Sequence, residues 1–224
     1  MILAAGRGER LRPLTDTTPK PLVEAGGETL LGRHLGRLAA AGFREAVVNV
    51  SHLGEQIVAR FGAGAHGMRI AWSREAAPLE TAGGIAQARA LLGEAPFLLV
   101  NADIWCDFEF SPLKDFPLGG RLAHLVLVPN PSWHPKGDFT LDRDEMRGLV
   151  GNAPAPRYTY AGISVIAPRL VDGVAAGQKA QLAPLWRAAA ERGEVSGELH
   201  EGYWNDVGTP ERLQDLNARL EKKP

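Results

Sequence analysis

The chain has 224 residues, a formal net charge of −1, 45% hydrophobic residues and 23% charged residues. These values predict one globular domain over residues 1–224, and they exclude the strong net charge by which proteins attract nucleic acid or anionic membranes. A single cysteine, Cys106, excludes an internal disulfide and a cysteine-rich zinc site, as is typical of a reducing compartment. Because the sequence shows neither an apolar stretch of about 20 residues nor a signal-peptide pattern, we expect a cytoplasmic protein.

The first expected strand is very short. Residues 1–3 are apolar and lead directly into a glycine turn, whereas a buried strand usually has about five residues. We therefore expect that a few residues are missing before Met1.

A glycine turn surrounded by cations follows this strand. Gly6 and Gly8 have no Cβ atom, so the backbone N–H groups of the turn can lie close to phosphate oxygens. Arg10 offers a planar fork for two phosphate oxygens, and Lys20 offers a mobile point charge. The turn is neither a P-loop nor a dinucleotide fingerprint, since Leu11 stands where the third glycine would be. It predicts a triphosphate site, and the alternative is an ordinary turn with solvated basic residues.

Apolar runs of strand length alternate with helical patterns beyond this turn, which indicates βαβ units. The expected strands cover residues 46–50, 69–72, 97–100 and 123–128, and the expected helices cover 30–42 and 83–93. Shorter strands at 137–142 and 158–166 are expected as antiparallel additions, and residues 211–222 as a helix that begins after Pro210. The sequence therefore predicts an α/β fold with a Rossmann-like, mixed but mainly parallel central sheet flanked by helices.

Two aspartates are candidates for a metal site. Asp103 follows the buried-type strand 97–100, and the carboxyl edge of an α/β sheet is where such folds bind ligands. Asp206 lies far downstream, between an aromatic pair and a glycine turn. Mg²⁺ prefers oxygen ligands and takes one or two protein carboxylates together with substrate phosphates, so the pair predicts a Mg²⁺ site. The alternative, an aspartate that caps a local turn, stays open for Asp206 in particular.

The opening L-A-A-G-R-G-E-R-L-R-P-L-T of residues 3–15, followed by Lys20 and Pro21, resembles the signature of the sugar-1-phosphate nucleotidyltransferases. The strand that ends in Asp103 and the segment W-N-D-V-G-T around Asp206 resemble two further motifs of this family. The resemblance implies a GT-A-like nucleotidyltransferase fold. It also implies transfer of a nucleotidyl group from a nucleoside triphosphate to a sugar 1-phosphate.

The resemblance also assigns expected roles to residues. Arg10 and Lys20 would act on the phosphates as catalytic residues, and Asp103 and Asp206 would hold Mg²⁺ on the nucleotide. The family usually has glycine where this chain has Ala102. The residues expected around the nucleotide are Leu3, Ala4, Ala5, Gly6, Gly8, Glu75, Glu80, Thr81 and Gly83.

The segment 75–84 resembles the loop by which the family contacts base and sugar, with Glu80 where glycine is usual. The Glu75 carboxylate can accept a hydrogen bond from N3–H of uracil, or two from N1–H and the amino group of guanine. The base therefore stays open on this residue alone. The alternative is that Glu75 is a solvated loop charge.

The variant L-E-T-A-G-G at 79–84 and G-D-F at 137–139 resemble one branch of the family. That branch transfers a uridylyl group from UTP to N-acetylmuramic acid α-1-phosphate in peptidoglycan recycling. The resemblance implies that Gly137 and Asp138 approach the sugar and that Tyr160 replaces a sugar-contacting asparagine of other branches. Arg157 is a candidate for the lactyl group of the acceptor.

Two other functions stay open at this point. One is a mannose-1-phosphate guanylyltransferase or another sugar-1-phosphate nucleotidyltransferase. The other is a non-catalytic nucleotide-sugar-binding regulatory module, because a fold does not guarantee chemistry. The expected partners are UTP and a sugar 1-phosphate with Mg²⁺ as cofactor, and neither nucleic acid nor a membrane is expected. The sequence does not determine the oligomeric state.

Overall fold

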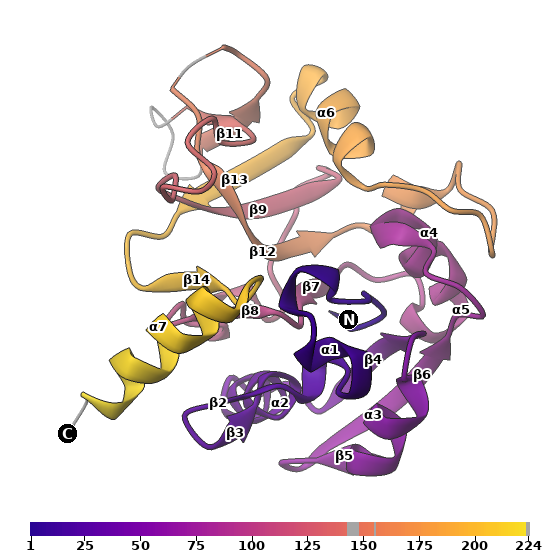
Figure 1. Cartoon of the computed structure of the whole chain (residues 1–224). Helices are drawn as coiled ribbons and strands as arrows, with labels where there is room; N and C mark the ends of the chain where they lie inside the picture. The colour runs from indigo at the N-terminus through magenta and orange to yellow at the C-terminus, as the bar shows by residue number, and fades with distance from the viewer. Residues whose placement is uncertain (143–147, 155, 223–224) are drawn as a thin grey trace.

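The computed structural model describes residues 1–142, 148–154 and 156–222. The strands of its main sheet are β1 (Ile2–Leu3), β4 (Glu45–Val50), β5 (Gly64–Ala65), β6 (Met68–Arg74), β7 (Phe97–Asn101), β9 (Ala123–Val128), β10 (Thr140–Leu141), β11 (Gly148–Gly151), β12 (Thr159–Ile166) and β13 (Val195–Leu199). They form one ten-stranded sheet in the order β10-β11-β13-β9-β12-β7-β1-β4-β6-β5, which runs through the molecule in Figure 1.

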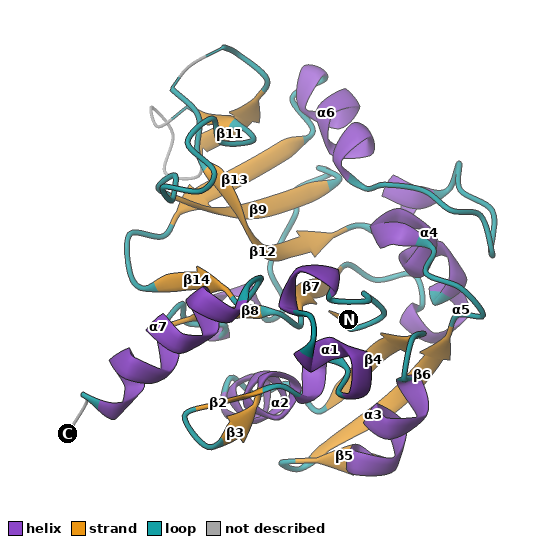
Figure 2. Cartoon of the chain, viewed as in Figure 1, coloured by secondary structure: helices purple, strands orange, loops and turns teal. Residues whose placement is uncertain are grey.

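Helices and two small ribbons complete the fold, as Figure 2 shows. The helices are α1 (Leu14–Thr17), α2 (Leu30–Ala40), α3 (Gly54–Phe61), α4 (Glu80–Gln87), α5 (Arg89–Leu92), α6 (Ala183–Glu191) and α7 (Pro210–Glu221). Short 3₁₀ turns are η1 (Glu9–Leu11), η2 (Lys20–Leu22), η3 (Ser111–Leu113) and η4 (Pro168–Val171). The two-stranded ribbons pair β2 (Glu24–Ala25) with β3 (Glu28–Thr29) and β8 (Ile104–Cys106) with β14 (Trp204–Asp206).

The sheet has a parallel half and a mixed half. Strand β1 lies between β4 and β7 and is parallel to both, and β6 continues the parallel order beyond β4. Strand β12 is antiparallel to both β7 and β9, while β13 is parallel to β9. The predicted mixed α/β sheet is confirmed. The strand expected at 123–128 is also present, although it pairs with an antiparallel neighbour rather than within a run of parallel strands.

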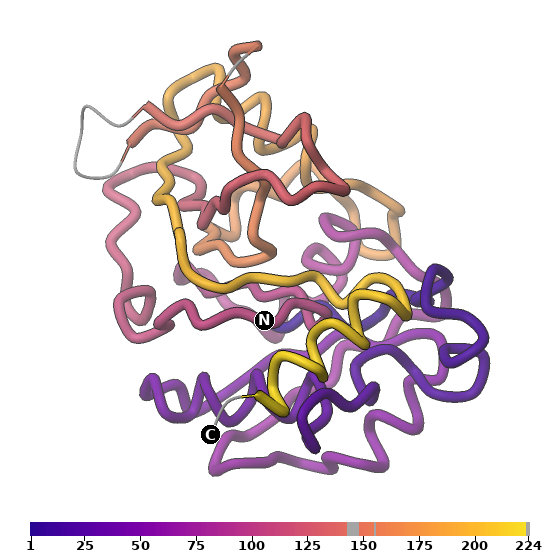
Figure 3. The backbone as a smooth tube through the Cα atoms, turned by 60° about the vertical axis from the view of Figure 1, so that its left-hand side comes forward, coloured from indigo at the N-terminus to yellow at the C-terminus, as the bar shows by residue number. Residues whose placement is uncertain are grey.

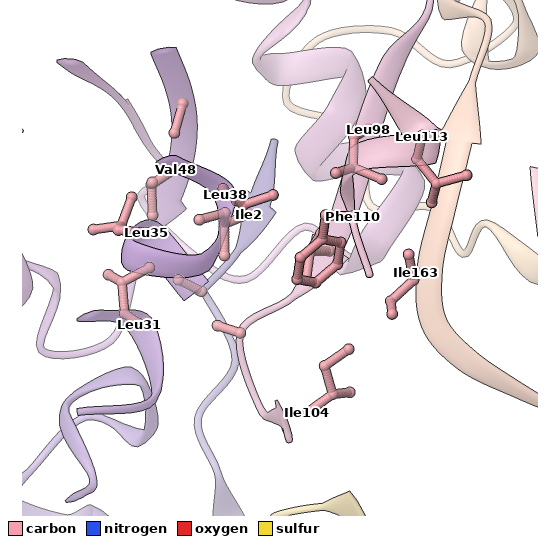
Figure 4. Close-up of a cluster of buried hydrophobic side chains, with 14 of the residues drawn as sticks. Ile2, Leu31, Leu35, Leu38, Val48, Leu98, Ile104, Phe110, Leu113 and Ile163 are labelled. Atoms are coloured by element: carbon pink, nitrogen blue, oxygen red, sulfur yellow. The ribbon is translucent and has the colours of Figure 1, made fainter. Parts of the chain in front are cut away.

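The hydrophobic core lies on both faces of the sheet, because side chains alternate along each strand. On one face, three leucines of α2 belong to the same buried cluster as Ile2, Val48 and Leu98, part of which Figure 4 shows; they are Leu31, Leu35 and Leu38. On the other face, Leu99 and side chains of α4 and α6 form a second cluster that includes Trp186. Strands covered on both faces read as continuous apolar runs, which is why the strand expectations were accurate.

The helix expected at 83–93 differs from the observed one. It begins earlier, at Glu80, and it is divided at Ala88 into α4 and α5. The early start has a local cause, since the backbone N–H of Leu79 donates to Glu75 Oε2 at 3.0 Å and fixes the chain before the first turn. Of the strand expected at 137–142, only Thr140–Leu141 forms β10, which is antiparallel as predicted.

The ribbon of β8 and β14 joins the centre of the chain to its C-terminal part and was not predicted. It places residues about 100 positions apart in register, with Ile104 opposite Asp206. Helix α7 follows the ribbon and packs on a third apolar cluster that includes Trp105 and Leu216. Figure 3 shows this C-terminal segment beside the first half of the chain. The predicted C-terminal helix is confirmed, with Pro210 in its first turn and the Thr209 hydroxyl accepting from Arg212 N.

Among the described residues, none of the helices combines the length and the apolar character that a membrane crossing requires.

Candidate active site

A cleft of about 1020 Å³ opens at the carboxyl ends of the parallel strands. This is the edge at which α/β sheets bind ligands, because the connecting loops diverge there. The sequence-predicted residues that line the cleft are Leu3, Ala4, Ala5, Gly6, Gly8, Arg10, Lys20, Glu75, Glu80, Thr81 and Asp103. Five other predicted residues are not among its lining residues: Gly83, Gly137, Asp138, Tyr160 and Asp206.

The two glycines of the N-terminal turn have different structural roles. Gly8 has φ +65°, and a Cβ atom there would lie 2.9 Å from Thr15 Cγ2. The hydroxyl of Thr15 also donates to Gly8 O at 2.8 Å, so Gly8 is needed for the turn itself. By contrast, a Cβ atom at Gly6 would meet nothing within 4 Å and would project into open space. Gly6 is therefore free of any packing constraint from the described protein.

The buried side-chain amide of Asn49 connects the glycine turn to the segment 75–84. Asn49 Oδ1 accepts from Ala4 N at 2.8 Å, and Asn49 Nδ2 donates to Glu75 Oε1 at 2.7 Å. Both side chains are buried, and Glu75 is only 6% exposed, which rules out a solvated loop charge. Sequence reasoning missed Asn49. The available signal was one polar residue within the otherwise apolar strand at 46–50.

The two neighbouring glycines of α4 pack against different parts of the molecule. A Cβ atom at Gly84 would lie 2.8 Å from Glu75 Oε1 and 2.9 Å from Asn49 Nδ2, so only glycine leaves room for the buried pair. A Cβ atom at Gly83 would instead overlap the carbonyl of Gln178. Gly83 was expected at the nucleotide, but the structure packs it against residues 178–180.

Glu80 has a backbone conformation that is rare for residues with a side chain. Its φ is +62°, within the left-handed region where glycine has no steric penalty. The side chain faces Lys179, with Oε1 3.6 Å from Nζ, and both residues line the cleft. Glu80 stands where the family usually has glycine. Its backbone is therefore strained, and its carboxylate belongs to a residue that lines the cleft.

The two candidate metal ligands lie close together, each with a cation. Asp103 Oδ2 is 2.5 Å from Lys20 Nζ, and Asp206 forms an ion pair with Arg212. The β8 and β14 ribbon brings the aspartates together, since Val207 N donates to Asp103 O at 2.8 Å. Asp206 thus belongs to the same site although it does not line the cleft.

Burial and neighbouring charges affect the two carboxyl groups in opposite directions. Burial raises the pKa of Asp103, but the charge and hydrogen bond of Lys20 outweigh it, so this pKa lies below its ordinary value. Burial raises the pKa of Asp206 above its ordinary value; the charge of Arg212 opposes this shift and the charge of Asp103 adds to it.

The donor set fits Mg²⁺ as a shared ligand of protein and substrate. Two neighbouring carboxylates supply hard oxygen atoms, and their mutual repulsion is of the kind that a divalent cation relieves. Within the described ranges, no group of three or more histidine, cysteine, aspartate or glutamate side chains could form a closed metal site. Phosphate oxygens and water would therefore complete the coordination.

The residues expected at the sugar lie in the mixed half of the sheet. Asp138 Oδ2 accepts from Tyr160 N at 2.9 Å, and Asp138 Oδ1 is 3.0 Å from His134 Nε2. The Tyr160 hydroxyl is 3.0 Å from Ser164 Oγ, and its ring packs edge-on against Trp186. The Tyr160 side chain is thus engaged with the core, and burial raises its pKa.

Arg157 also has partners within its own loop. Its Nε donates to Ala153 O at 2.8 Å, and its Nη2 donates to Asn152 O at 2.9 Å. These bonds use the guanidinium to stabilise the loop. The structure does not bring Arg157 together with the two aspartates.

A family model described as nucleotidyl transferase matches residues 1–117. The chain belongs to this family. A relative from Neisseria meningitidis serogroup B named N-acetylmuramate alpha-1-phosphate uridylyltransferase is 49% identical over 230 residues, which cover 97% of this chain and 96% of the relative. A mannose-1-phosphate guanyltransferase from Yarrowia lipolytica is 32% identical over 94% of this chain and 60% of its own length.

The fold agrees with this nucleotidyl transferase family. A crystal structure described as a putative glucose-1-phosphate thymidylyltransferase from Bacillus anthracis superposes with a TM-score of 0.83 at 19% identity, covering 100% of this chain and 95% of that one. The family expected from the N-terminal motif and the predicted nucleotidyltransferase fold are therefore confirmed.

Proposed function

We propose that this nucleotidyl transferase moves the uridylyl group of UTP onto N-acetylmuramic acid α-1-phosphate, giving UDP-N-acetylmuramic acid and pyrophosphate. One structural observation carries the chemistry: a glycine turn, two cations and Asp103 line one cleft, and the β8 and β14 ribbon holds Asp206 beside Asp103. Similarity to the Neisseria relative along 97% of the chain supports the acceptor. The reaction would belong to peptidoglycan recycling in the cytoplasm.

The glycine turn and its cations would bind the triphosphate. The backbone at Gly6 borders open space, so phosphate oxygens can approach its N–H groups directly. Arg10 would hold the β- and γ-phosphates that leave as pyrophosphate, and Lys20 would neutralise the α-phosphate. Lys20 is held in place by Asp103, which orients the ammonium group before the nucleotide arrives.

The buried Glu75 carboxylate would read the base. Its two oxygens already accept from Asn49 Nδ2 and Leu79 N, which fixes the orientation of the group. A carboxylate has about four acceptor positions, so it can still accept from N3–H of uracil. The same group suits the N1–H and amino group of guanine, and the base preference needs a direct assay.

Transfer would be a single in-line displacement. A phosphate oxygen of the sugar 1-phosphate attacks the α-phosphorus of UTP, the bond from the α-phosphorus to the bridging oxygen breaks, and pyrophosphate leaves with its electron pair. The acceptor oxygen is already anionic, so no general base is needed. Positioning and charge stabilisation then supply most of the rate enhancement.

Asp103 and Asp206 would hold Mg²⁺. The ion supplies charge neutralisation on the phosphate oxygens when bound. Lys20 and Arg212 form ion pairs with the two carboxylates, and their positive charges favour the ionised forms.

A pyrophosphate-release assay tests the proposal. UTP and GTP are each combined with the 1-phosphates of N-acetylmuramic acid, N-acetylglucosamine, glucose and mannose, with Mg²⁺ present. Selective turnover of UTP with N-acetylmuramic acid 1-phosphate is expected. Turnover of GTP with mannose 1-phosphate would favour the guanylyltransferase, and UTP binding without pyrophosphate release from any pair would favour a regulatory module.

A further inference from the structure

Arg212 is a buried cation beside the candidate metal ligands. It lies in the first turn of α7, is only 7% exposed, and forms an ion pair with Asp206 through Nη1. Burying a guanidinium is costly unless its donors are satisfied, and it carries five of them. The ion pair with Asp206 uses one nitrogen, so the group retains capacity for another anion.

A second arginine approaches the same point. A Cβ atom at Gly208 would overlap Arg212 Nη2 and lie 3.3 Å from Arg10 Nη2. Gly208 and Arg10 line the cleft, and Arg212 lies against Gly208 without being a lining residue itself. Two neighbouring cations repel each other, and an anion bound between or beside them removes this repulsion. The arrangement therefore points to an anionic ligand next to Asp206.

An exposed aromatic ring also lies next to Arg212. The Arg212 Cζ lies 4.8 Å from the centre of the Trp133 ring, and Trp133 is 48% exposed. The loop that carries Trp133 is fixed, because Asn130 Nδ2 donates to Pro135 O and Arg157 O while Asn130 Oδ1 accepts from Thr159 Oγ1. A large, exposed aromatic ring next to a cation is a suitable surface for an anionic sugar.

We propose that Arg212 and Trp133 bind the acceptor: Arg212 binds an anionic group of the sugar 1-phosphate, and Trp133 contacts the sugar ring. This inference rests on the proposed function, since it concerns the acceptor of that reaction. The anionic group has two possible sources, the phosphate that every acceptor carries and the lactyl carboxylate of N-acetylmuramic acid. Both offer the oxygen pair that a planar guanidinium binds in a bidentate manner.

The first experiment compares two acceptors in Arg212→Gln and Arg212→Lys. N-acetylmuramic acid 1-phosphate and N-acetylglucosamine 1-phosphate differ only in the lactyl ether, so the pair separates the two sources. Loss of a charge-assisted hydrogen bond should raise the acceptor KM by about 10- to 100-fold, with a smaller rise for Arg212→Lys. A rise for the lactyl acceptor alone identifies the carboxylate as the ligand, and an equal rise for both identifies the phosphate.

The second experiment uses Trp133, whose exposure makes unfolding of the variant a minor concern. Trp133→Ala should raise the acceptor KM by about 3- to 10-fold, and Trp133→Phe should restore most of the affinity. Acceptor added with a non-transferable UTP analogue should change the tryptophan fluorescence of the parent protein, and Trp133→Phe should lose this change. Leu91→Ala is the matched control, since Leu91 is similarly exposed but belongs to α5.

The KM for UTP separates acceptor binding from a structural role. If Arg212 only positions Asp206, its variants should lower kcat for both acceptors, leave the acceptor KM unchanged and alter the UTP dependence. That result, or an unchanged acceptor KM in Trp133→Ala, would overturn the inference. A parent protein that turns over no sugar 1-phosphate would instead refute the proposed function, so the two failures are distinguishable.

Discussion

The proposed nucleotide half and the proposed acceptor half of the site are built in different ways. The phosphate part of the nucleotide half uses residues close together in sequence, on the turn after β1, and a buried network of Asn49 and Glu75 connects this turn to the loop at 75–84. The acceptor half combines the loop of Trp133, the end of β14 and the first turn of α7, which are far apart in the chain. Backbone geometry shapes the first half, whereas tertiary packing shapes the second. The first half should therefore tolerate substitution less well.

The largest expected effect is the loss of the carboxylate between the two halves. Asp103→Ala removes the partner of Lys20 and one of the two oxygen ligands proposed for Mg²⁺. Turnover should fall on the order of 10³-fold, because an oriented charge contact contributes a few kcal/mol to the transition state. Steady-state pyrophosphate release measures this, with the exposed Asp215→Ala as control. Turnover of Asp103→Ala within a few fold of the parent would contradict the metal assignment.

His34 is buried on α2 and should make the free energy of unfolding depend on pH. Burial first, and then the positive charges of Arg37 and Arg33, lower its pKa from 6.5 to about 4. Between these values the unfolded chain binds a proton that the folded chain does not, so the free energy of unfolding should fall as pH falls. The slope is at most about 1.4 kcal/mol per pH unit, and the total is about 3 kcal/mol.

Urea unfolding at several pH values between 7 and 4 checks this expectation. His34→Leu should flatten the pH dependence over that window, while His52→Gln should leave it as in the parent protein. Above pH 6.5 the contribution of His34 is fully present, and it should not vary further. Parallel curves for the parent and His34→Leu would show that the buried imidazole is not the titrating group.

Asn49 tests whether the nucleotide half acts as one unit. Asn49→Ala leaves Ala4 N without its acceptor and Glu75 without one of its donors. A buried unsatisfied group costs about 1–3 kcal/mol, so the Kd for UTP should rise by about 10- to 100-fold. Calorimetric titration with UTP measures it. The acceptor KM should change much less, and an equal change in both would mean that the halves are not independent.

The smallest expected effect distinguishes the two glycines of the turn. Gly6→Ala should leave the melting temperature unchanged but weaken UTP binding by about 10-fold, since its methyl group would occupy the space proposed for phosphate. Gly8→Ala should destabilise the fold by about 1 kcal/mol or more, because of its positive φ and the contact with Thr15. Equal melting temperatures for both variants would contradict this division.

Sequence reasoning succeeded where the relevant signal is local. The glycine turn follows β1 and Asp103 follows β7, so their position at the carboxyl edge follows from strand order, whereas Arg10 and Lys20 lie on 3₁₀ turns farther along the chain. The predictions of the apolar strands were accurate because an apolar run is also a local signal. Asn49 had a signal, a polar residue in an apolar strand, but its partner Glu75 lies on another loop, and only the fold brings them together.

The acceptor half was less predictable because its contacts are long-range. The pairing of β8 with β14 brings Asp206 beside Asp103, and no local pattern predicts that register. From the sequence alone, Arg212 resembles an ordinary surface residue of a helix. Its burial becomes evident only when the position of α7 in the fold is known. Tyr160 was expected at the sugar from resemblance. In the structure its hydroxyl lies within hydrogen-bond distance of Ser164 and its ring packs on Trp186, and these contacts depend on tertiary packing.

An internal competition assay shows directly which nucleotide and which sugar 1-phosphate the enzyme prefers. UTP and GTP at equal concentration are mixed with equal amounts of the 1-phosphates of N-acetylmuramic acid, N-acetylglucosamine and mannose in the presence of Mg²⁺, and the nucleotide sugars are identified by mass spectrometry at low conversion. The ratios of product, calibrated with standards of each nucleotide sugar, give relative kcat/KM values. UDP-N-acetylmuramic acid should predominate over every other nucleotide sugar. Predominance of a GDP-sugar, or of a UDP-sugar without the lactyl group, would contradict the proposed function.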